Sequence, residues 1–222
     1  MPTSFDMQVA QDVDLSPAEQ CLKRLGFEPE SVSAGWRWLG MVSGTSMKIE
    51  FLCELDDQPA EVVVIAAGCR SLGAMNLRGT GYVREDFERV VLTGTLPDGR
   101  VVSVPIPVAG LGGYLLAKGT ALRNRGKEKD YYDFVYVLLY NRAGGPAEAA
   151  RVLRSGPFSS RLDGLSVLWK EISARFADSS GAGPVAYANQ ALQAHPLSDA
   201  GILRQDAVGA VADFLDGLLG RH

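Results

Sequence analysis

The chain has 222 residues, of which 46% are hydrophobic and 22% are charged, as in an ordinary globular protein of one or two domains. This composition excludes a wholly disordered, collagenous or coiled-coil protein, and the formal net charge of −4 argues against a protein that binds nucleic acid over its whole surface. No run approaches about 18 apolar residues, and the N-terminal residues lack the basic and apolar regions of a secretory signal. We therefore expect a cytoplasmic protein with no membrane contact.

Cysteine and histidine offer little material for a metal or redox site. The three cysteines, Cys21, Cys53 and Cys69, are odd in number and have no C-x-x-C spacing, which predicts reduced thiols rather than a disulfide framework or a zinc site. The two histidines, His195 and His222, have no partner at a useful spacing. This argues against a histidine metal site or a histidine-based catalytic triad.

The first predicted element is a short helix that begins at Ser16. Ser16 and Glu19 have the spacing of a capping box, and Pro17 suits the first helical turn. Gly26 follows the apolar stripe of this helix, where a left-handed residue would end it.

Five segments then have the composition or alternation of β-strands. They are residues 36–42, 47–55, 61–65, 90–96 and 101–108. Turn residues separate the first two segments and also the last two, so each of these pairs predicts a hairpin. The glycine-punctuated residues 72–82 are expected to form a loop.

From Gly110 onward the apolar spacing predicts helices. Their expected ranges are 111–124, 129–140, 146–153, 162–176, 185–192 and 207–219, with a loop at 179–184. Strands followed by helices indicate an α+β fold. We expect a mixed sheet, built from the five strands, in residues 1–110 and a helical part in residues 111–222 that packs on it.

The most informative charged residues lie around the junction of the first two of these helices. Lys118 and Arg125 are seven residues apart and share a helix face, and Asp130 and Asp133 share a face of the next helix. Two antiparallel helices would bring Lys118 and Asp133 to one cleft. The plainer interpretation is a surface ion pair between Lys129 and Asp133 at i, i+4 spacing.

The same junction holds a run of cations. Arg123, Arg125, Lys127 and Lys129 fall within seven consecutive residues and form the one candidate patch for a polyanion. A solvated helix end explains most runs of this kind.

This segment resembles the C-terminal helical motif of AbiEii-type nucleotidyltransferases, the toxin half of bacterial abortive-infection toxin–antitoxin pairs. The residues that match are Lys118, Ala121, Leu122, Arg125, Lys129, Asp130, Tyr132 and Asp133. Upstream, residues 47–52 resemble the strand that carries the third acidic position of the family, which falls on Glu50. The resemblance covers about residues 5–150.

The resemblance implies a nucleotidyltransferase-like mixed sheet followed by a helical C-terminal half. It also implies transfer of a nucleotide from a nucleoside triphosphate (NTP) to an acceptor, with RNA or tRNA as candidate acceptors and an antitoxin protein as partner. In this chemistry Mg²⁺ is held against the triphosphate by the two carboxylates of a D-x-D strand, and a third acid helps to activate the attacking hydroxyl.

The resemblance also assigns residues to these roles. Lys118, Asp133 and Glu50 are the expected catalytic residues, and Lys118, Arg125 and Lys129 are the expected nucleotide-binding residues. Glu50, Lys118 and Asp133 are therefore expected to line one cleft.

The sequence departs from the family pattern at the D-x-D pair, where two placements remain. Asp12 and Asp14 have the right chemistry but lie only about a dozen residues before Gly26 and Phe27, where the family leaves closer to twenty. They also suit the N-terminus of the helix that begins at Ser16. Asp6 lies at the distance along the chain that the family shows. The second acid of the pair would then be Gln8, which is neutral. The candidate metal ligands are thus Asp6, Asp12, Asp14 and Glu50, although Glu50 also suits a solvent-facing strand position.

The glycine loop that cradles the triphosphate in the family has no counterpart in this sequence, either because the chain starts late or because it is a degenerate relative. Three functions follow as hypotheses. The chain is a Mg²⁺-dependent nucleotidyltransferase, or a catalytically impaired relative that binds a partner protein or nucleic acid, or an unrelated α+β binding module.

Overall fold

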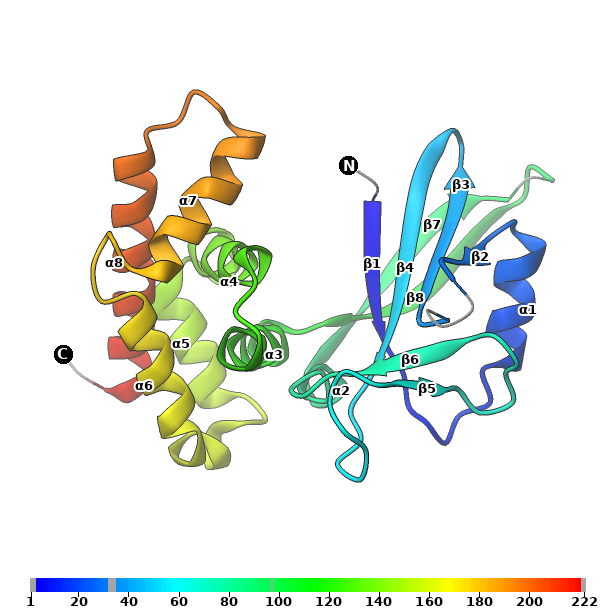
Figure 1. The fold of residues 1–222 in the computed structure, drawn as a ribbon, viewed down its shortest axis with the longest axis horizontal. Helices are drawn as coiled ribbons and strands as arrows, with labels where there is room; N and C mark the ends of the chain where they lie inside the picture. Colours follow the sequence, from blue (N-terminus) through cyan, green and yellow to red (C-terminus); the bar gives the residue numbers. More distant parts are fainter. Residues whose placement is uncertain (1–2, 32–34, 97, 221–222) are drawn as a thin grey trace. The chain divides into compact units, whose positions relative to one another are not determined.

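The structure, a computed structural model, describes residues 3–31, 35–96 and 98–220. It is α+β as predicted, with a curled mixed sheet in the N-terminal half followed by helices in the C-terminal half (Figure 1). The chain divides into two compact units, Met1–Gly81 and Tyr82–His222. Within the described residues, none of the helices has the length and apolar character needed to cross a bilayer.

The first unit holds a six-stranded mixed sheet in the order β2-β3-β4-β6-β5, with β1 paired to β4 beside this path. Its strands are β1 (Thr3–Gln8), β2 (Glu28–Pro29), β3 (Arg37–Val42), β4 (Thr45–Cys53), β5 (Val63–Ile65) and β6 (Gly73–Asn76). The β3–β4 hairpin was predicted and is confirmed. Its two-residue turn places Ser43 and Gly44 at φ of 49° and 79°, as a tight hairpin turn requires. Both β1 and β6 run parallel to β4.

The prediction of a loop over residues 72–82 is wrong, because part of this segment is strand β6 and its end begins the short helix α2 (Tyr82–Glu85). Asn76, at the end of β6, is fully buried. Its side-chain amide donates to the carbonyls of Leu55, Gln58 and Pro59. These bonds satisfy a buried polar group through long-range partners, which no local glycine pattern reveals.

Helix α1 (Ser16–Arg24) forms as predicted, but the expected capping box is absent. The carboxylate of Glu19 is buried and accepts the backbone N–H groups of Arg70 and Ser71 as well as the ammonium of Lys23. Burial opposes the charged form, yet these bonds lower the pKa of Glu19 to about 2. Glu19 therefore ties α1 to the segment before β6 instead of capping its own helix.

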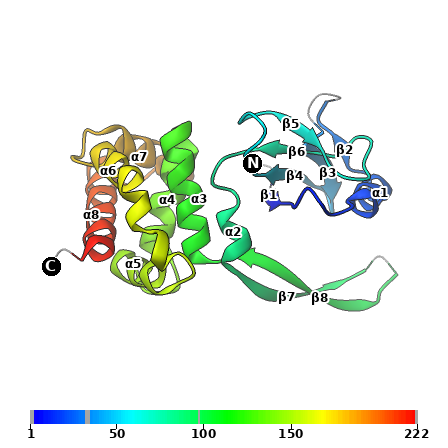
Figure 2. The same ribbon diagram turned by 90° about the horizontal axis from the view of Figure 1, so that it is seen from below.

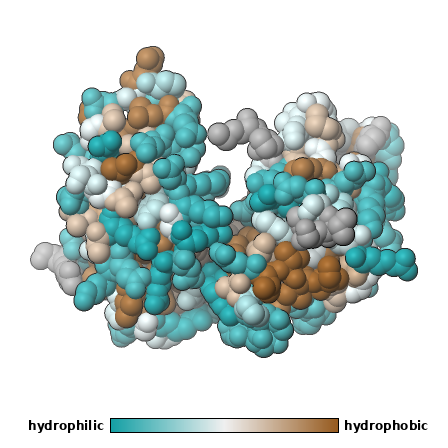
Figure 3. Space-filling view, viewed as in Figure 1, coloured by the Kyte–Doolittle hydropathy of each residue, from teal (hydrophilic) through white to brown (hydrophobic). Residues whose placement is uncertain are grey.

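The core of the first unit lies between α1 and the sheet. Its buried members are Leu22, Phe27, Trp38, Phe51, Cys53, Ala66, Leu72 and Ala74. On the face seen in Figure 3, hydrophobic residues gather over β5 and β6, where Ile65 is 54% exposed.

The second unit opens with α2 and a hairpin of two nine-residue strands, β7 (Phe87–Thr95) and β8 (Val101–Ala109). The hairpin and its turn were predicted and are confirmed. The strands were also expected to join the main sheet, and that expectation is wrong because they form a two-stranded sheet of their own, a long ribbon in Figure 2. Most of their side chains are exposed.

The pairing of the hairpin accommodates two prolines of β8. Pro105 lies opposite Val91, and Pro107 lies opposite Arg89. The backbone bond from Leu96 to Arg100 marks the even-numbered pairs as hydrogen-bonded. Ladder bonds alternate along an antiparallel pair, so both prolines occupy pairs that need no N–H donor.

Six α-helices and two 3₁₀ turns complete the second unit. They are α3 (Leu111–Asn124), α4 (Glu128–Tyr140), α5 (Pro146–Ser155), η1 (Ser159–Arg161), η2 (Asp163–Leu165), α6 (Ser166–Arg175), α7 (Ala182–Ala194) and α8 (Ala200–Leu219). The predicted helix at 162–176 begins late because the 3₁₀ turn η2 precedes it. Helix α7 begins inside the predicted loop, with Pro184 in its first turn, where a missing N–H is tolerated.

The helices enclose one large apolar core. Its fully buried large side chains are Leu115, Leu116, Leu122, Phe134, Leu138, Leu153, Phe158, Trp169, Ile172 and Phe214. This core fixes α3 and α4 against each other, and these two helices carry the charged motif identified in the sequence.

Candidate functional site

The candidate residues form two clusters, one in each unit. The strand cluster consists of Asp6, Arg37, Lys48 and Glu50 on β1, β3 and β4. The helix cluster consists of Lys118, Arg125, Lys129, Asp130 and Asp133 on α3, α4 and the turn between them.

The parallel pairing of β1 with β4 defines the strand cluster. Asp6 is the Cα partner of Glu50 in this register. Side chains alternate along a strand, and partners in register share a face of the sheet. The structure thus brings two of the predicted metal ligands to adjacent positions on one face.

Glu50 is held by two cations. Its Oε1 atom accepts from Arg37 Nε at 2.8 Å, and its Oε2 atom lies 3.1 Å from Lys48 Nζ. Only 13% of the side chain is exposed. Burial opposes ionisation, but Arg37 and Lys48 together lower the pKa of the Glu50 carboxyl. Glu50 is therefore a carboxylate whose two oxygens already have cationic partners.

Gln8 follows Asp6 on the same face of β1, two residues along. Its side-chain amide donates to the carbonyl of Val9 at 3.3 Å. The position that would carry the second acid of a D-x-D pair thus holds a neutral group, as the sequence states.

The alternative acids, Asp12 and Asp14, lie between β1 and α1. Asp12 is exposed, and Asp14 accepts the backbone N–H of Ser16 at 2.9 Å. This bond at the start of α1 lowers the pKa of the Asp14 carboxyl. The structure does not bring Asp12 or Asp14 into register with Glu50 on β4.

The donor set for Mg²⁺ is small. Across the described part of the chain, no group of three or more His, Cys, Asp or Glu side chains is arranged to hold a metal ion. Mg²⁺ needs only one or two carboxylates when phosphate oxygens and water complete its shell. Asp6 and Glu50 fit that minimum in chemistry and register, although Glu50 would have to share its oxygens with the cations that hold it.

Lys118 is the centre of the helix cluster. It lies in α3 with only 15% of its side chain exposed, and its ammonium is 2.7 Å from Asp133 Oδ2 and 3.3 Å from Asp130 Oδ1. The antiparallel arrangement expected from the sequence therefore brings Lys118 and Asp133 into contact. The i, i+4 ion pair between Lys129 and Asp133 is present as well, since Lys129 Nζ lies 2.6 Å from the same Oδ2 atom of Asp133.

Asp130 is the most deeply buried charge of this cluster, with 4% of its side chain exposed. Arg125 binds both of its oxygens, at 2.8 and 2.9 Å. Burial opposes ionisation of Asp130, yet Arg125 and Lys118 lower the pKa of its carboxyl. A bidentate pair of this kind fixes geometry as well as charge, so Asp130 connects the end of α3 to the start of α4.

The turn between these helices depends on Gly126. Its φ is +53°, and a Cβ atom there would lie 2.8 Å from Arg175 Nη1. Arg175 in turn donates to the hydroxyl of Tyr131 at 2.6 Å. Gly126 thus supplies the positive φ that the turn needs, and the hydrogen bond from Arg175 to Tyr131 lies beside it.

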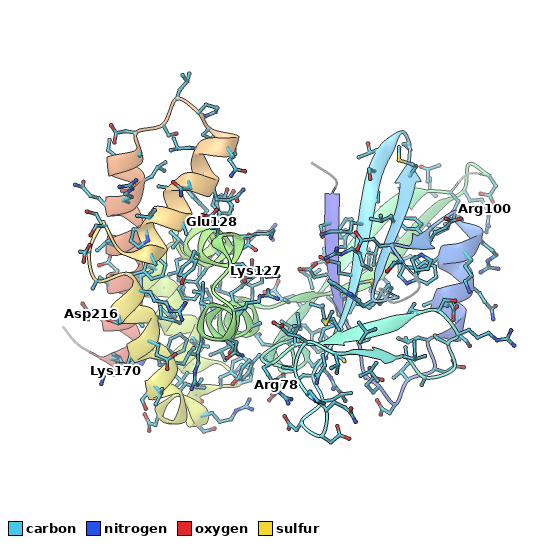
Figure 4. All side chains as sticks on the ribbon, viewed as in Figure 1. Arg78, Arg100, Lys127, Glu128, Lys170 and Asp216 are labelled. Atoms are coloured by element: carbon cyan, nitrogen blue, oxygen red, sulfur yellow. The ribbon has the colours of Figure 1, made fainter. Side chains whose placement is uncertain are left out.

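The helix cluster has three cations, Lys118, Arg125 and Lys129, against two carboxylates. Lys127, the exposed residue just before α4, adds a fourth cation; Figure 4 labels it beside Glu128 at the start of the helix. With Glu128 counted, four cations face three carboxylates, and this surplus of one positive charge makes the helix junction attractive to an anion.

Sequence reasoning passed over Arg37 and Lys48, the partners of Glu50, although the sequence contained a signal for both. Lys48 and Glu50 are two residues apart in one strand and so share a face. A two-residue turn at Ser43 and Gly44 also fixes the hairpin register, which pairs Arg37 with Glu50.

Glu50 lies in the first unit, whereas Lys118 and Asp133 lie in the second. Their expected convergence on a single cleft stays a prediction. Comparison of the chain with protein-family models, curated proteins and solved structures found no match.

Proposed function

We propose that this protein is a nucleotidyltransferase of the AbiEii type that binds a nucleoside triphosphate with Mg²⁺ and transfers a nucleotide to an acceptor. The observation that carries the proposal is the register of Asp6 with Glu50 on neighbouring parallel strands. Two carboxylates on one face of adjacent strands are what metal-assisted phosphoryl transfer requires of a sheet.

The helix cluster supports the same proposal. Lys118 is partly buried and held between Asp130 and Asp133, so its ammonium has a fixed position. A fixed ammonium can neutralise charge on a triphosphate without reorganising during the reaction. Asp133 would orient Lys118, and Arg125 and Lys129 would contribute positive charge around it.

In this proposal Asp6 and Glu50 would hold Mg²⁺, which supplies neutralisation of the triphosphate charge when bound. The chain's own part is to hold both carboxylates on one face of the sheet and to keep that of Glu50 ionised. The lowered pKa of the Glu50 carboxyl serves that purpose.

A second candidate is a catalytically impaired relative that binds nucleotide, nucleic acid or an antitoxin-like protein without transfer. Two observations favour it. Gln8 stands where a second acid would bind metal, and both oxygens of Glu50 are engaged by Arg37 and Lys48. Loss of one metal-binding carboxylate should cost several kcal/mol of transition-state stabilisation, or about a thousandfold in rate.

Calorimetric titration of the full chain with each nucleoside triphosphate and Mg²⁺ tests whether the protein binds nucleotide. We expect binding of at least one triphosphate, and its loss in Lys118→Ala and in Asp133→Ala. Lys170→Ala on α6 is the matched control, because Lys170 is exposed and lies away from Lys127 in the same unit (Figure 4). Absence of binding in the parent chain would contradict the transferase and would restrict the impaired relative to binding nucleic acid or protein.

Incubation with labelled triphosphates, Mg²⁺ or Mn²⁺ and total cellular RNA then separates the two. Robust labelling that disappears in Lys118→Ala and in Asp133→Ala supports the transferase. Triphosphate binding without labelling supports the impaired relative. Labelling that survives both substitutions points to a contaminating enzyme and gives no support to the transferase.

A further inference from the structure

Helix α4 carries a row of aromatic side chains that the proposed function does not use. Tyr132, Tyr136 and Tyr140 follow one another at i, i+4 spacing, which places them on one helix face. The rings of Tyr132 and Tyr136 are stacked with centroids 5.5 Å apart, and those of Tyr136 and Tyr140 are 4.8 Å apart. We call these three residues the tyrosine row.

The row is anchored at its inner end and open at its outer end. Tyr132 stacks on Tyr187 of α7, with centroids 5.7 Å apart and an interplanar angle of 19°. Tyr187 is 2% exposed, whereas Tyr136 is 45% and Tyr140 is 65% exposed. A buried ring thus fixes the orientation of a row whose last two members face solvent.

Cations lie at the start of the same helix. Lys129, one turn before the row on the same face, has 70% of its side chain exposed. Lys127 precedes it and is also exposed. Lys129 also pairs with Asp133, at 2.6 Å. Exposed aromatic rings beside cations are the features of surfaces that bind single strands, because rings stack on bases and cations contact the phosphates.

The length of the row distinguishes a strand from a single nucleotide. Tyr132 and Tyr140 are eight residues apart, which is about 12 Å along an α-helix. One nucleobase covers the face of a single ring, so a mononucleotide would leave most of the row unused. Several successive bases would use it.

We propose that the tyrosine row and the cations before it form a site for unpaired nucleobases of a single-stranded nucleic acid, with Tyr136 and Tyr140 as the stacking surface and Lys127 and Lys129 as phosphate contacts. Binding at this site needs neither a triphosphate nor Mg²⁺. The tyrosines take no part in the transfer reaction proposed above, although Lys129 belongs to both sites.

The test is fluorescence anisotropy with labelled oligonucleotides of about ten nucleotides, in the absence of triphosphate and Mg²⁺. The probes are single-stranded RNA, single-stranded DNA and a duplex of the same sequence. We expect the full chain to bind the single strands and to bind the duplex more weakly, since paired bases cannot stack on tyrosine. The RNA and DNA arms decide which sugar the site accepts.

Substitutions in the row give the decisive comparison. Removing one ring in Tyr136→Ala or Tyr140→Ala should weaken single-strand binding by roughly five- to 150-fold. Tyr136→Phe and Tyr140→Phe keep the ring and should bind nearly as the parent does. Leu197→Ala is the control for loss of an exposed apolar group, because Leu197 is fully exposed and lies outside the row.

The cations are tested through salt dependence. Lys127→Ala should reduce the slope of log K against log salt by about one between about 50 and 200 mM salt, whereas Lys170→Ala should leave it unchanged. Circular dichroism checks that each variant is folded.

Three results would overturn the proposal. The first is a parent chain that binds no single strand at low salt, and the second is equal binding by the parent and the alanine variants of the row. The third is a folded tyrosine variant that changes its oligomeric state while oligonucleotide binding is unaffected, which would identify the row as a protein contact. Because the assay contains no triphosphate, each result leaves the test of nucleotide transfer intact.

Discussion

Two buried carboxylates, Asp130 and Glu19, show how charged side chains connect elements of this protein. Each is nearly inaccessible to water, and each is compensated by donors from outside its own helical turn. A buried charge that keeps its partners is tolerated, but removing one partner leaves the other uncompensated. The free energy of unfolding should therefore be sensitive to the loss of a single hydrogen-bonding partner at either site.

Replacing Asp130 should destabilise the helical unit strongly. Asp130→Ala leaves Arg125 and part of the charge of Lys118 without their carboxylate, so we expect the free energy of unfolding to fall by about 3 kcal/mol or more. Urea denaturation followed by circular dichroism measures the change. Lys129→Ala removes an exposed partner of Asp133 and should cost less than about 1 kcal/mol. Equal losses in the two variants would contradict this account.

Glu19 should make stability depend on pH in the acid range. Its pKa is about 2 in the folded protein against 4.5 for an ordinary glutamate, so the unfolded chain binds the extra proton first as the pH falls. The stabilisation is complete above pH 4.5 and is lost as the pH falls toward 2, with a limit of about 3 kcal/mol. Denaturant unfolding from pH 6 to pH 2 follows this loss.

Two substitutions of a carboxylate by an amide provide the test and the control for this pH dependence. Glu19→Gln should lower stability at neutral pH and flatten the curve in the acid range, whereas Glu28→Gln at an exposed position in the same unit should leave it nearly unchanged. If the Glu19→Gln variant lost stability in acid as steeply as the parent chain does, another carboxylate would be responsible for that loss.

At the scale of elements, the turn between α3 and α4 determines whether the helix cluster forms. Gly126 has a φ of +53°, which strains any residue with a Cβ atom, and a Cβ atom there would also displace the end of the Arg175 side chain. We expect Gly126→Ala to destabilise the protein by about 1–2 kcal/mol and to loosen the contact between Lys118 and Asp133. Thermal unfolding of the variant gives the first quantity, and triphosphate affinity gives the second.

Gly209 in α8 provides the matched comparison, because nothing lies within 4 Å of a Cβ atom at that position and its φ is not positive. Gly209→Ala should stabilise the helix by about 0.5–1 kcal/mol. The two glycine-to-alanine changes therefore have opposite expected signs. Destabilisation by both would mean that backbone conformation is not the deciding factor.

The sequence predicted these elements unevenly, for physical reasons. The range of α3 and the β3–β4 hairpin followed from apolar spacing and turn residues, which are local signals. β6 was missed because its pairing with β4 and β5 is long-range. The contact of Lys118 with Asp133 was foreseeable from helix geometry, whereas the bonds from Glu19 to Arg70 and Ser71 cross about fifty residues and leave no local trace.

At the scale of the whole molecule, the proposed transfer reaction depends on the carboxylates that β1 places beside β4. We expect the chain to transfer nucleotides poorly, since Gln8 occupies the second position of the acidic pair. Gln8→Asp should raise transfer by restoring a carboxylate on the face of Asp6, and labelling of RNA with a radioactive triphosphate measures it. Gln8→Asn, which stays neutral, is the control.

A gain in Gln8→Asp with no gain in Gln8→Asn would support a nucleotidyltransferase that is limited by one missing charge. Equal activity in the parent and both variants would mean that position 8 lies outside the reaction. The result bears on the strand cluster only, because the substitution leaves the helix cluster of the second unit unchanged.

The prolines of β8 also affect the register of the hairpin and make its two outer edges differ. A slip of one residue that turned Pro105 and Pro107 toward β7 would leave a ladder acceptor without its donor at each of them, so the prolines disfavour that alignment. On the outer side, the same prolines leave gaps in the row of donors along β8, whereas the outward positions of β7 are all occupied by residues that have an N–H. Two of the five outward positions of β8 therefore lack a donor, so its outer edge offers a third strand fewer hydrogen bonds than the outer edge of β7 does.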